Sequence, residues 1–385
     1  MKILFCSTAT QLTTGYAKIS AQILNYLAQY HEVVHIAFQA NSIDKIPRKI
    51  DPRIKVIPDD LFAVDTILEH IDEVKPDYVM VYNDVIVCSN YCKKFKSLEH
   101  KNFKIFMYLD LTYEHQNWVL DIAETCDLLI CFHKTWMKHV IDMGVDPEKV
   151  TYLDHPPIQI SKQIHTNIFK FKEDDFVILN LNRNSYRKML DITLDGFIRF
   201  FKQNGCSPKI KLFLGCKFQY NGSYNINILA QKFSKIHGLT PGERDTLLNT
   251  SIIKFPQDSV SDDIINQVYM SCDIGINTCG GEGYGLCNIE HQMYEKPQIV
   301  TGIKNFYEFF SPLSTYFMPP ITKITIPQDL DVVGGFLEIP DSKDLTTGLQ
   351  FYYDNPYLRE NHGIEGKKFL TNRYNNFSNL KNLFE

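Results

Sequence analysis

The stretch from Asp273 to Gly302 contains residues whose types and spacing suit the binding of phosphate and hydroxyl groups. A predicted strand ends at Asn277, and a helix is expected to begin near Leu286. The loop between them contains four glycines, Gly280, Gly281, Gly283 and Gly285. Backbone N–H groups at the beginning of such a helix attract phosphate oxygens, and glycines let a ligand approach the backbone closely. The stretch therefore predicts a phosphate site between a strand and a helix.

Two glutamates in this stretch suit the binding of hydroxyl groups. Glu282 lies in the loop, and Glu290 lies eight residues later, in the expected helix. A carboxylate has two acceptor oxygens and can therefore bind vicinal hydroxyls. We expect Glu282 to contact a sugar and Glu290 to bind ribose hydroxyls. The alternative interpretation is a glycine-rich turn with two surface glutamates.

Alternating strands and helices are expected to position these residues. Short apolar runs predict buried strands in the first half of the chain, at residues 2–7, 33–38, 78–82, 104–109 and 128–132. After a break at 150–167, which contains Pro156 and Pro157, further strands are expected at 176–181, 209–215, 252–255, 274–277 and 298–300. Ser261 is expected to cap the helix that follows it. The pattern predicts two doubly wound α/β domains with parallel sheets, and a ligand in the cleft between them.

Composition narrows the classes of protein to consider. The chain has 385 residues and a formal net charge of -5, which gives no electrostatic reason to expect binding to nucleic acid or to a membrane surface. Its ten cysteines form no disulfide or zinc pattern, because Cys88 and Cys92 have no second pair. The apolar N-terminus ends after Ser7, and no run reaches the length of a membrane span. We expect a cytoplasmic protein with reduced thiols.

The block E-G-Y-G-L-C-N-I-E, followed by M-Y-E-K-P-Q-I-V-T, resembles a known signature. It is similar to the nucleotide-sugar signature of retaining glycosyltransferases with the GT-B fold, in particular glycosyltransferase family four. In that family the first glutamate lies at the donor sugar and the second at the ribose, which implies these roles for Glu282 and Glu290. The resemblance also places Gly283, Tyr284, Gly285 and Leu286 at the donor. Glu295 stands where the family usually has glycine, which leaves the turn after the helix open.

A second block, L-N-L-N-R-N-S-Y-R-K-M-L-D at residues 179–191, resembles the family's G-R-x-x-x-x-K-G segment. Arg183 and Lys188 have the matching separation. The resemblance implies that they bind the diphosphate of the donor, which gains negative charge as the glycosidic bond breaks. Met189 stands where the family usually has glycine, and the geometry of that turn is left open. A basic cap between a strand and a helix is the alternative.

Two N-terminal segments resemble the family less specifically. The loop at 13–18, T-T-G-Y-A-K, is similar to its G-Y-A-R segment, which implies that Gly15 approaches the diphosphate and that Tyr16 lies near the acceptor. Many members carry a histidine at the end of a first-domain strand, where this chain has Asp110 and then His115. We expect Asp110 to orient or partly deprotonate an acceptor hydroxyl and His115 to lie on the acceptor side. A loop cap and a surface histidine are the alternatives.

The resemblance covers nearly the whole chain and implies a GT-B fold, with two Rossmann-like domains that face each other across a cleft. Residues 1–160 would form the acceptor domain and 161–371 the nucleotide-sugar domain, with a helix at about 372–385 that packs back on the first. The implied reaction is retaining hexosyl transfer from a UDP-glucose or GDP-mannose type of donor to a glycan, lipid or protein hydroxyl. No cofactor or metal is expected, because Arg183, Lys188 and the helix dipole would replace a cation. Asp329-Leu330-Asp331, the D-x-D of the chain, is expected in a loop.

Other functions compete with transfer as interpretations of the sequence. A sugar-nucleotide epimerase on the same fold would need no acceptor, and a phosphorylase would need a cofactor lysine that is not recognisable here. A dinucleotide-dependent oxidoreductase is disfavoured because no G-x-G-x-x-G follows either first strand. A non-catalytic protein that binds sugar nucleotides remains the main alternative. We expect no nucleic-acid partner and at most peripheral contact with a membrane.

Overall fold

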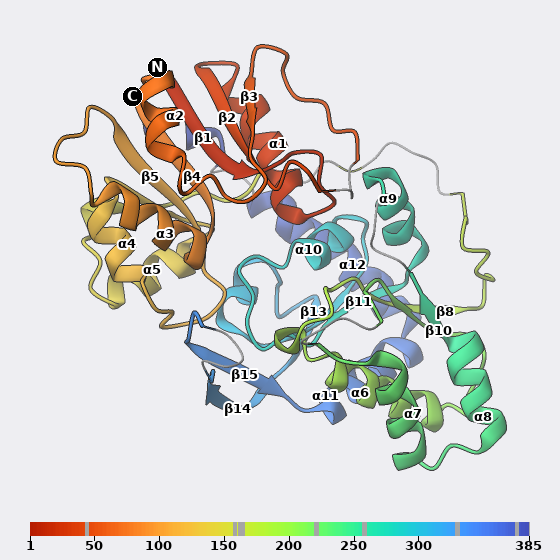
Figure 1. The fold of residues 1–385 in the computed structure, drawn as a ribbon. Coiled ribbons are helices and arrows are strands. Elements are labelled where there is room, and N and C mark those ends of the chain that lie inside the picture. Colours follow the sequence, from red (N-terminus) through yellow and green to blue (C-terminus); the bar gives the residue numbers. More distant parts are fainter. Residues whose placement is uncertain are drawn as a thin grey trace. The chain divides into compact units, whose positions relative to one another are not determined.

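The computed structural model describes residues 1–42, 46–156, 160, 166–218, 223–255, 260–327, 332–373 and 377–384. The chain divides into two compact units (Figure 1). Unit 1 comprises Met1–Pro157, Ile326–Gly335 and Tyr374–Glu385, and unit 2 comprises Ile158–Thr325 and Phe336–Arg373. The chain therefore passes from one unit to the other more than once, and both ends belong to unit 1.

The described part of unit 1 contains a seven-stranded parallel sheet in the order β3-β2-β1-β4-β5-β6-β7. Its strands are β1 (Lys2–Thr8), β2 (Glu32–Phe38), β3 (Lys55–Pro58), β4 (Tyr78–Asp84), β5 (Lys104–Asp110), β6 (Leu128–Cys131) and β7 (Val150–Tyr152). Its helices are α1 (Gly15–Leu27), α2 (Ile67–Val74), α3 (Val85–Phe95), α4 (Val119–Thr125), α5 (Lys134–Asp142), η1 (Pro147–Lys149) and η5 (Phe377–Phe384). The inner strands β1, β4 and β5 are buried along most of their length, as expected for a parallel sheet covered on both faces.

The described part of unit 2 contains a six-stranded parallel sheet in the order β10-β9-β8-β11-β12-β13. Its strands are β8 (Phe176–Asn180), β9 (Ile210–Leu214), β10 (Ile252–Lys254), β11 (Ile274–Asn277), β12 (Gln298–Thr301) and β13 (Thr315–Met318), with an antiparallel pair β14 (Pro320–Thr325) and β15 (Phe336–Pro340). Its helices are η2 (Tyr186–Lys188), α6 (Leu190–Gln203), α7 (Ile226–Ile236), α8 (Pro241–Thr246), η3 (Leu247–Ser251), α9 (Asp262–Ser271), α10 (Leu286–Met293), η4 (Lys304–Glu308), α11 (Ser342–Asp354) and α12 (Pro356–Arg373).

The prediction of two doubly wound α/β domains with parallel sheets is confirmed. The ten predicted strands are present, with ends that differ by one or two residues. Ser261 caps α9 as predicted, because its hydroxyl accepts a hydrogen bond from the N–H of Ile264 at 3.3 Å. The predicted break at 150–167 was too early, since Val150–Tyr152 forms the edge strand β7. Three residues are too few to show a strand pattern. Pro157 and residues 161–165 of the break lie outside the described residues.

The last segment of the chain packs on unit 1. Residues 377–384 form the 3-10 helix η5, and the ring of Phe384 is fully buried. Its centroid lies 5.1 Å from the ring of Tyr78 and 5.4 Å from the ring of Phe106, on two neighbouring strands. The hydroxyl of Tyr26 on α1 donates a hydrogen bond to the carbonyl of Ser378 at 2.9 Å. Unit 1 therefore takes part of its core from residues that follow all of unit 2 in sequence.

Candidate functional site

The glycine-rich loop connects β11 to α10 in unit 2, as the sequence predicts. Gly285 caps the N-terminus of α10 with φ +82°, a left-handed conformation that favours glycine. A Cβ atom at Gly285 would also lie 2.7 Å from the ring of Phe306. The ring of Tyr284 is buried, with its centroid 4.5 Å from that of Phe309. The backbone of Gly283 to Leu286 is therefore held in the fixed turn that opens the helix.

Glu282 is enclosed by two cations. The ammonium of Lys188 forms an ion pair with one carboxylate oxygen, and Nη1 of Arg187 lies 3.3 Å from the other. The side chains of Lys188 and Glu282 are only 9% and 12% exposed. Burial alone would raise the pKa of Glu282, but the charges of Lys188 and Arg187 outweigh it and lower the pKa to about 2. Two cations around one carboxylate leave one surplus positive charge, which suits an anionic ligand.

The two loops that carry these charges are joined by hydrogen bonds. The hydroxyl of Thr278 lies 2.9 Å from the carbonyl oxygen of Lys188 and 3.0 Å from that of Met189. The N–H of Gly280 donates to the carbonyl of Arg187 at 3.0 Å. Nζ of Lys188 also donates to Oδ1 of Asn182 at 2.9 Å. The turn after β8 and the loop after β11 therefore form one polar surface at the carboxyl ends of two neighbouring strands.

Glu290 lies on α10 and is buried. It accepts a hydrogen bond from the hydroxyl of Tyr269 on α9 at 2.8 Å. Burial and the charge of Glu290 raise the pKa of Tyr269, so the phenol remains a hydrogen-bond donor. Burial also raises the pKa of the Cys287 thiol to about 11, and the charges of Glu290, Lys188 and Glu282 all contribute to this value. The structure thus pairs Lys188 with Glu282 and Tyr269 with Glu290.

Arg183 occupies a different environment from Lys188. Its side chain is exposed, and it forms no hydrogen bond or ion pair with any residue that the structure describes. The guanidinium that joins Lys188 at Glu282 belongs to Arg187 instead. Sequence reasoning missed Arg187, Asn182 and Tyr269 because their partners lie at least six residues away along the chain. The adjacent pair of cations was visible in the sequence, but their pairing with Glu282, 94 residues from Lys188, was not.

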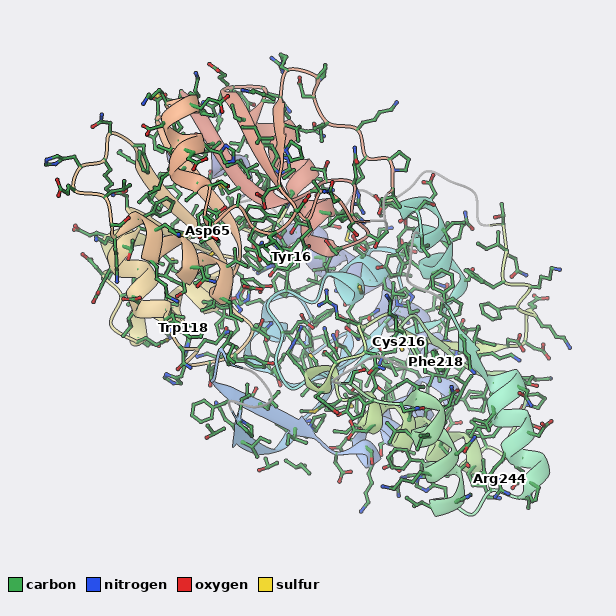
Figure 2. All side chains as sticks on the ribbon, in the orientation of Figure 1. Tyr16, Asp65, Trp118, Cys216, Phe218 and Arg244 are labelled. Carbon is green, nitrogen blue, oxygen red and sulfur yellow. The ribbon has the colours of Figure 1, made fainter. Side chains whose placement is uncertain are left out.

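In unit 1 the structure brings Tyr16 and Asp110 together. Tyr16 lies in the first turn of α1, next to the exposed Gly15, and its side chain is labelled in Figure 2. Its hydroxyl donates a hydrogen bond to Oδ2 of Asp110 at the end of β5. Burial and the charges of Asp110 and Asp84 hold the pKa of Tyr16 well above its usual value. Asp84 and Asp110 are register partners at the ends of β4 and β5.

His115 lies in the loop after β5 and is exposed. Its backbone has φ +56°, and its N–H donates to Nε2 of His139 at 3.0 Å. The two imidazole rings pack edge to face with centroids 4.9 Å apart. The structure therefore places the ring of His115 against α5.

Metal ions in proteins are bound by clustered His, Cys, Asp and Glu side chains, and residues of these types occur throughout the described ranges. No group of three or more His, Cys, Asp or Glu side chains is placed to hold a metal ion within them. Asp329 and Asp331 of the D-x-D motif lie outside the described residues. Among the helices that the structure describes, none combines the length and the apolar character needed to cross a bilayer.

The sequence matches no model of a known protein family and no curated protein, but solved structures match its fold. HepE of Anabaena, in complex with UDP and glucose, has a TM-score of 0.68 at 14% identity, over 100% of this chain and 98% of that chain. Sucrose-phosphate synthase from Thermosynechococcus elongatus has a TM-score of 0.70 at 12% identity, over 100% and 98%. WaaG, a glycosyltransferase involved in lipopolysaccharide biosynthesis, has a TM-score of 0.65 at 12% identity, over 100% and 99%. The chain thus has the GT-B fold, as the sequence predicts.

Proposed function

We propose that this chain is a glycosyltransferase that moves a hexosyl group from a UDP- or GDP-sugar to an acceptor hydroxyl. The observation that carries the proposal is the buried carboxylate of Glu282 between Lys188 and Arg187, at the glycine-rich loop that opens α10. HepE, whose fold this chain shares, has been solved with UDP and glucose and with UDP-glucose. We further propose that transfer proceeds with retention of configuration and without a bound metal ion.

The diphosphate of the donor would bind at Lys188 and at the N-terminus of α10. The surplus positive charge around Glu282 attracts an anion, and the helix dipole adds to this attraction. As the bond between sugar and phosphate breaks, negative charge grows on the leaving diphosphate, and a fixed ammonium stabilises that charge. Arg183 is exposed and would reach the diphosphate only from the side that faces solvent. These groups together would take the place of a metal ion.

The two glutamates would bind the two sugars of the donor. Glu282 is held ionised, so both of its oxygens can accept hydrogen bonds from hydroxyls of the transferred sugar. Glu290 would accept hydrogen bonds from the ribose hydroxyls. The hydroxyl of Tyr269 donates a hydrogen bond to Oε2 of Glu290 and so helps to fix the orientation of this carboxylate. The donor would thus be bound by one carboxylate in the loop and by a second carboxylate on the helix.

The acceptor groups would come from unit 1. Asp110 would accept a hydrogen bond from the attacking hydroxyl, and Tyr16 would hold the carboxylate of Asp110 in place. Gly15, exposed at the beginning of α1, would offer its N–H to the diphosphate. His115 would contribute to the acceptor side from the loop after β5. A glycan, a lipid or a protein could supply the hydroxyl.

Ligand-induced thermal stabilisation tests the donor site. We expect either UDP and UDP-glucose or GDP and GDP-mannose to raise the melting temperature of the wild type. At a hundredfold excess over the dissociation constant the gain is roughly 2.7 kcal/mol, or about 5–10 °C for a unit of this size. Lys188→Ala should lose the response. Lys202→Ala, which removes an ion pair with Glu243 elsewhere in unit 2, should keep it. If none of the four ligands stabilises the wild type, the proposed function is wrong.

A further inference from the structure

Arg187 is bonded to the glycine-rich loop through both its backbone and its side chain. Its carbonyl accepts a hydrogen bond from the N–H of Gly280 at 3.0 Å, and its Nη1 donates to the carbonyl of Gly281 at 2.7 Å. The same Nη1 lies 3.3 Å from Oε1 of Glu282. Three successive loop residues therefore have Arg187 as a partner. The contact with Gly280 comes from the backbone of Arg187, and the contacts with Gly281 and Glu282 come from one guanidinium nitrogen.

The backbone of Glu282 is fixed from a second direction. Nδ2 of Asn305 donates to the carbonyl of Glu282 at 2.6 Å, and the N–H of Glu338 donates to the carbonyl of Gly280 at 2.9 Å. The loop is therefore tied on one side by Arg187 and on the other by Asn305 and Glu338. The direction of the Glu282 carboxylate is set by its partners Lys188 and Arg187.

Lys188 and Arg187 are placed differently with respect to a ligand. The ammonium of Lys188 is bonded to Glu282 and Asn182, while its backbone carbonyl is bonded to the hydroxyl of Thr278. The flexible side chain between them allows the ammonium to turn toward a phosphate. A carboxylate that is nearly buried is strongly destabilised when it loses its cationic partners. Arg187 is anchored to Gly281 and remains beside Glu282 when Lys188 turns away. It can therefore keep the carboxylate in place at that moment.

We infer that Arg187 is a positioning residue: it holds the carboxylate of Glu282 toward the donor sugar and leaves Lys188 to bind the diphosphate. This inference rests on the proposed function, because it assigns the sugar to Glu282 and the diphosphate to Lys188. It also gives the two adjacent cations separate tasks. Lys188 contacts the ligand, whereas Arg187 acts through Glu282.

The proposed roles of Arg187 and Lys188 can be distinguished by comparing the affinity for a sugar nucleotide with the affinity for the same nucleotide without its sugar. Isothermal titration with UDP-glucose and UDP, and with GDP-mannose and GDP, gives four dissociation constants for each variant. In Arg187→Met we expect binding of the sugar nucleotide to weaken about tenfold while binding of the bare nucleotide stays within about twofold. Lys188→Ala should weaken both. Arg187→Lys should recover part of the sugar-nucleotide affinity because it restores the charge but not the fork.

Three further variants serve as controls. Arg199→Met removes an ion pair with Asp195 on α6, 3.6 Å long and outside the site, and should change neither affinity. Glu282→Gln should reproduce the loss seen in Arg187→Met. Adding Arg187→Met to Glu282→Gln should cause little further loss, because both changes act on one carboxylate. Retained binding of the bare nucleotide shows that the Arg187, Arg199 and Glu282 variants are folded, and circular dichroism shows it for Lys188→Ala.

The possible results are distinct. Equal weakening of sugar nucleotide and bare nucleotide in Arg187→Met would make Arg187 a phosphate ligand and overturn the inference while the proposed function stands. Unchanged affinities for both would overturn it as well. A wild type that binds none of the four ligands would overturn the proposed function itself, and the inference with it.

Discussion

At Glu282, burial and charge act in opposite directions on one carboxyl group. Burial raises its pKa, and the charges of Lys188 and Arg187 lower it further than burial raises it, to about 2. The unfolded chain has no such pair, and its glutamates titrate near their usual value of about 4.3. Part of the folding free energy of unit 2 is therefore linked to pH through this residue.

A carboxyl group with a lowered pKa stabilises the fold fully above its unfolded pKa, and this contribution is lost as the pH falls through its folded pKa. The wild type should therefore lose roughly 3 kcal/mol through Glu282 between about pH 5 and pH 2. Glu282→Gln lacks this titration, so its free energy of unfolding should fall less over the same range. Urea unfolding at several pH values measures the difference. Glu365→Gln, a change in an exposed ion pair with Lys368, should follow the wild type.

The sequence predicted part of the candidate site and left part of it open. Glu282, Glu290 and Lys188 could be found because their spacing matches a known signature. Met189 and Glu295 stand where that signature has glycine, yet both adopt the left-handed conformation, with φ of +46° and +60°. The turns therefore keep a geometry that favours glycine. The sequence does not indicate that Met189 and Glu295 adopt this conformation, because contacts with the surrounding structure impose the conformation.

At the scale of elements, buried strands were predictable and edge strands were not. The inner strands are continuous apolar runs because helices cover both faces of each sheet. β3 has the sequence K-V-I-P and is mostly exposed, and β7 has only three residues, so neither carries this pattern. The helix α10, which carries Glu290, was predicted to begin near Leu286 after the glycine-rich loop, and it begins there. Its close packing against α12 was not, because it depends on a glycine in a later helix.

Gly363 on α12 allows that close packing. A Cβ atom at this position would lie 1.9 Å from the carbonyl oxygen of Glu295, just beyond the end of α10. Because the obstacle is backbone, Gly363→Ala should destabilise unit 2 by roughly 2–3 kcal/mol, although alanine favours helix by about 1 kcal/mol. Urea unfolding monitored by circular dichroism measures the change. A variant as stable as the wild type would show that the helices are not packed as closely as described.

A matched glycine supplies the control for this change. Gly242 lies in the helix α8, and a Cβ atom built there meets no atom within 4 Å. Gly242→Ala should leave stability unchanged or raise it by up to about 1 kcal/mol. The opposite signs at the two positions would separate crowding from helix propensity.

At the scale of the whole molecule, unit 1 is assembled from separate stretches of the chain. The sequence predicted two α/β domains and the GT-B fold, and the structure and its neighbours confirm both. It gave no sign that residues 326–335 belong to unit 1. Their contacts include a hydrogen bond from the N–H of Asn117 to the carbonyl of Val333 at 2.8 Å. Backbone hydrogen bonds of this kind do not depend on residue type and leave no pattern in a sequence.

The buried ring of Phe384 should stabilise unit 1 selectively. Phe384→Ala removes a fully buried aromatic ring that packs against Tyr78 and Phe106, at a cost of roughly 3–5 kcal/mol. Hydrogen exchange followed by mass spectrometry should show faster exchange in β4 and β5 and unchanged exchange in β8 and β11. Asn382→Ala, on an exposed position of the same helix, should exchange like the wild type. Equal acceleration in both units would contradict the division of the chain described above.

The place of Phe384 in the sequence also sets an order of events during translation. Every residue of unit 2 leaves the ribosome before residues 377–384, which complete the core of unit 1. Domains usually finish folding in the order of their synthesis. In this chain, synthesis of unit 1 begins before that of unit 2, but unit 1 can complete its folding only after unit 2 has been synthesised. During translation, unit 2 is therefore fully synthesised while unit 1 still lacks the helix η5 that completes its core.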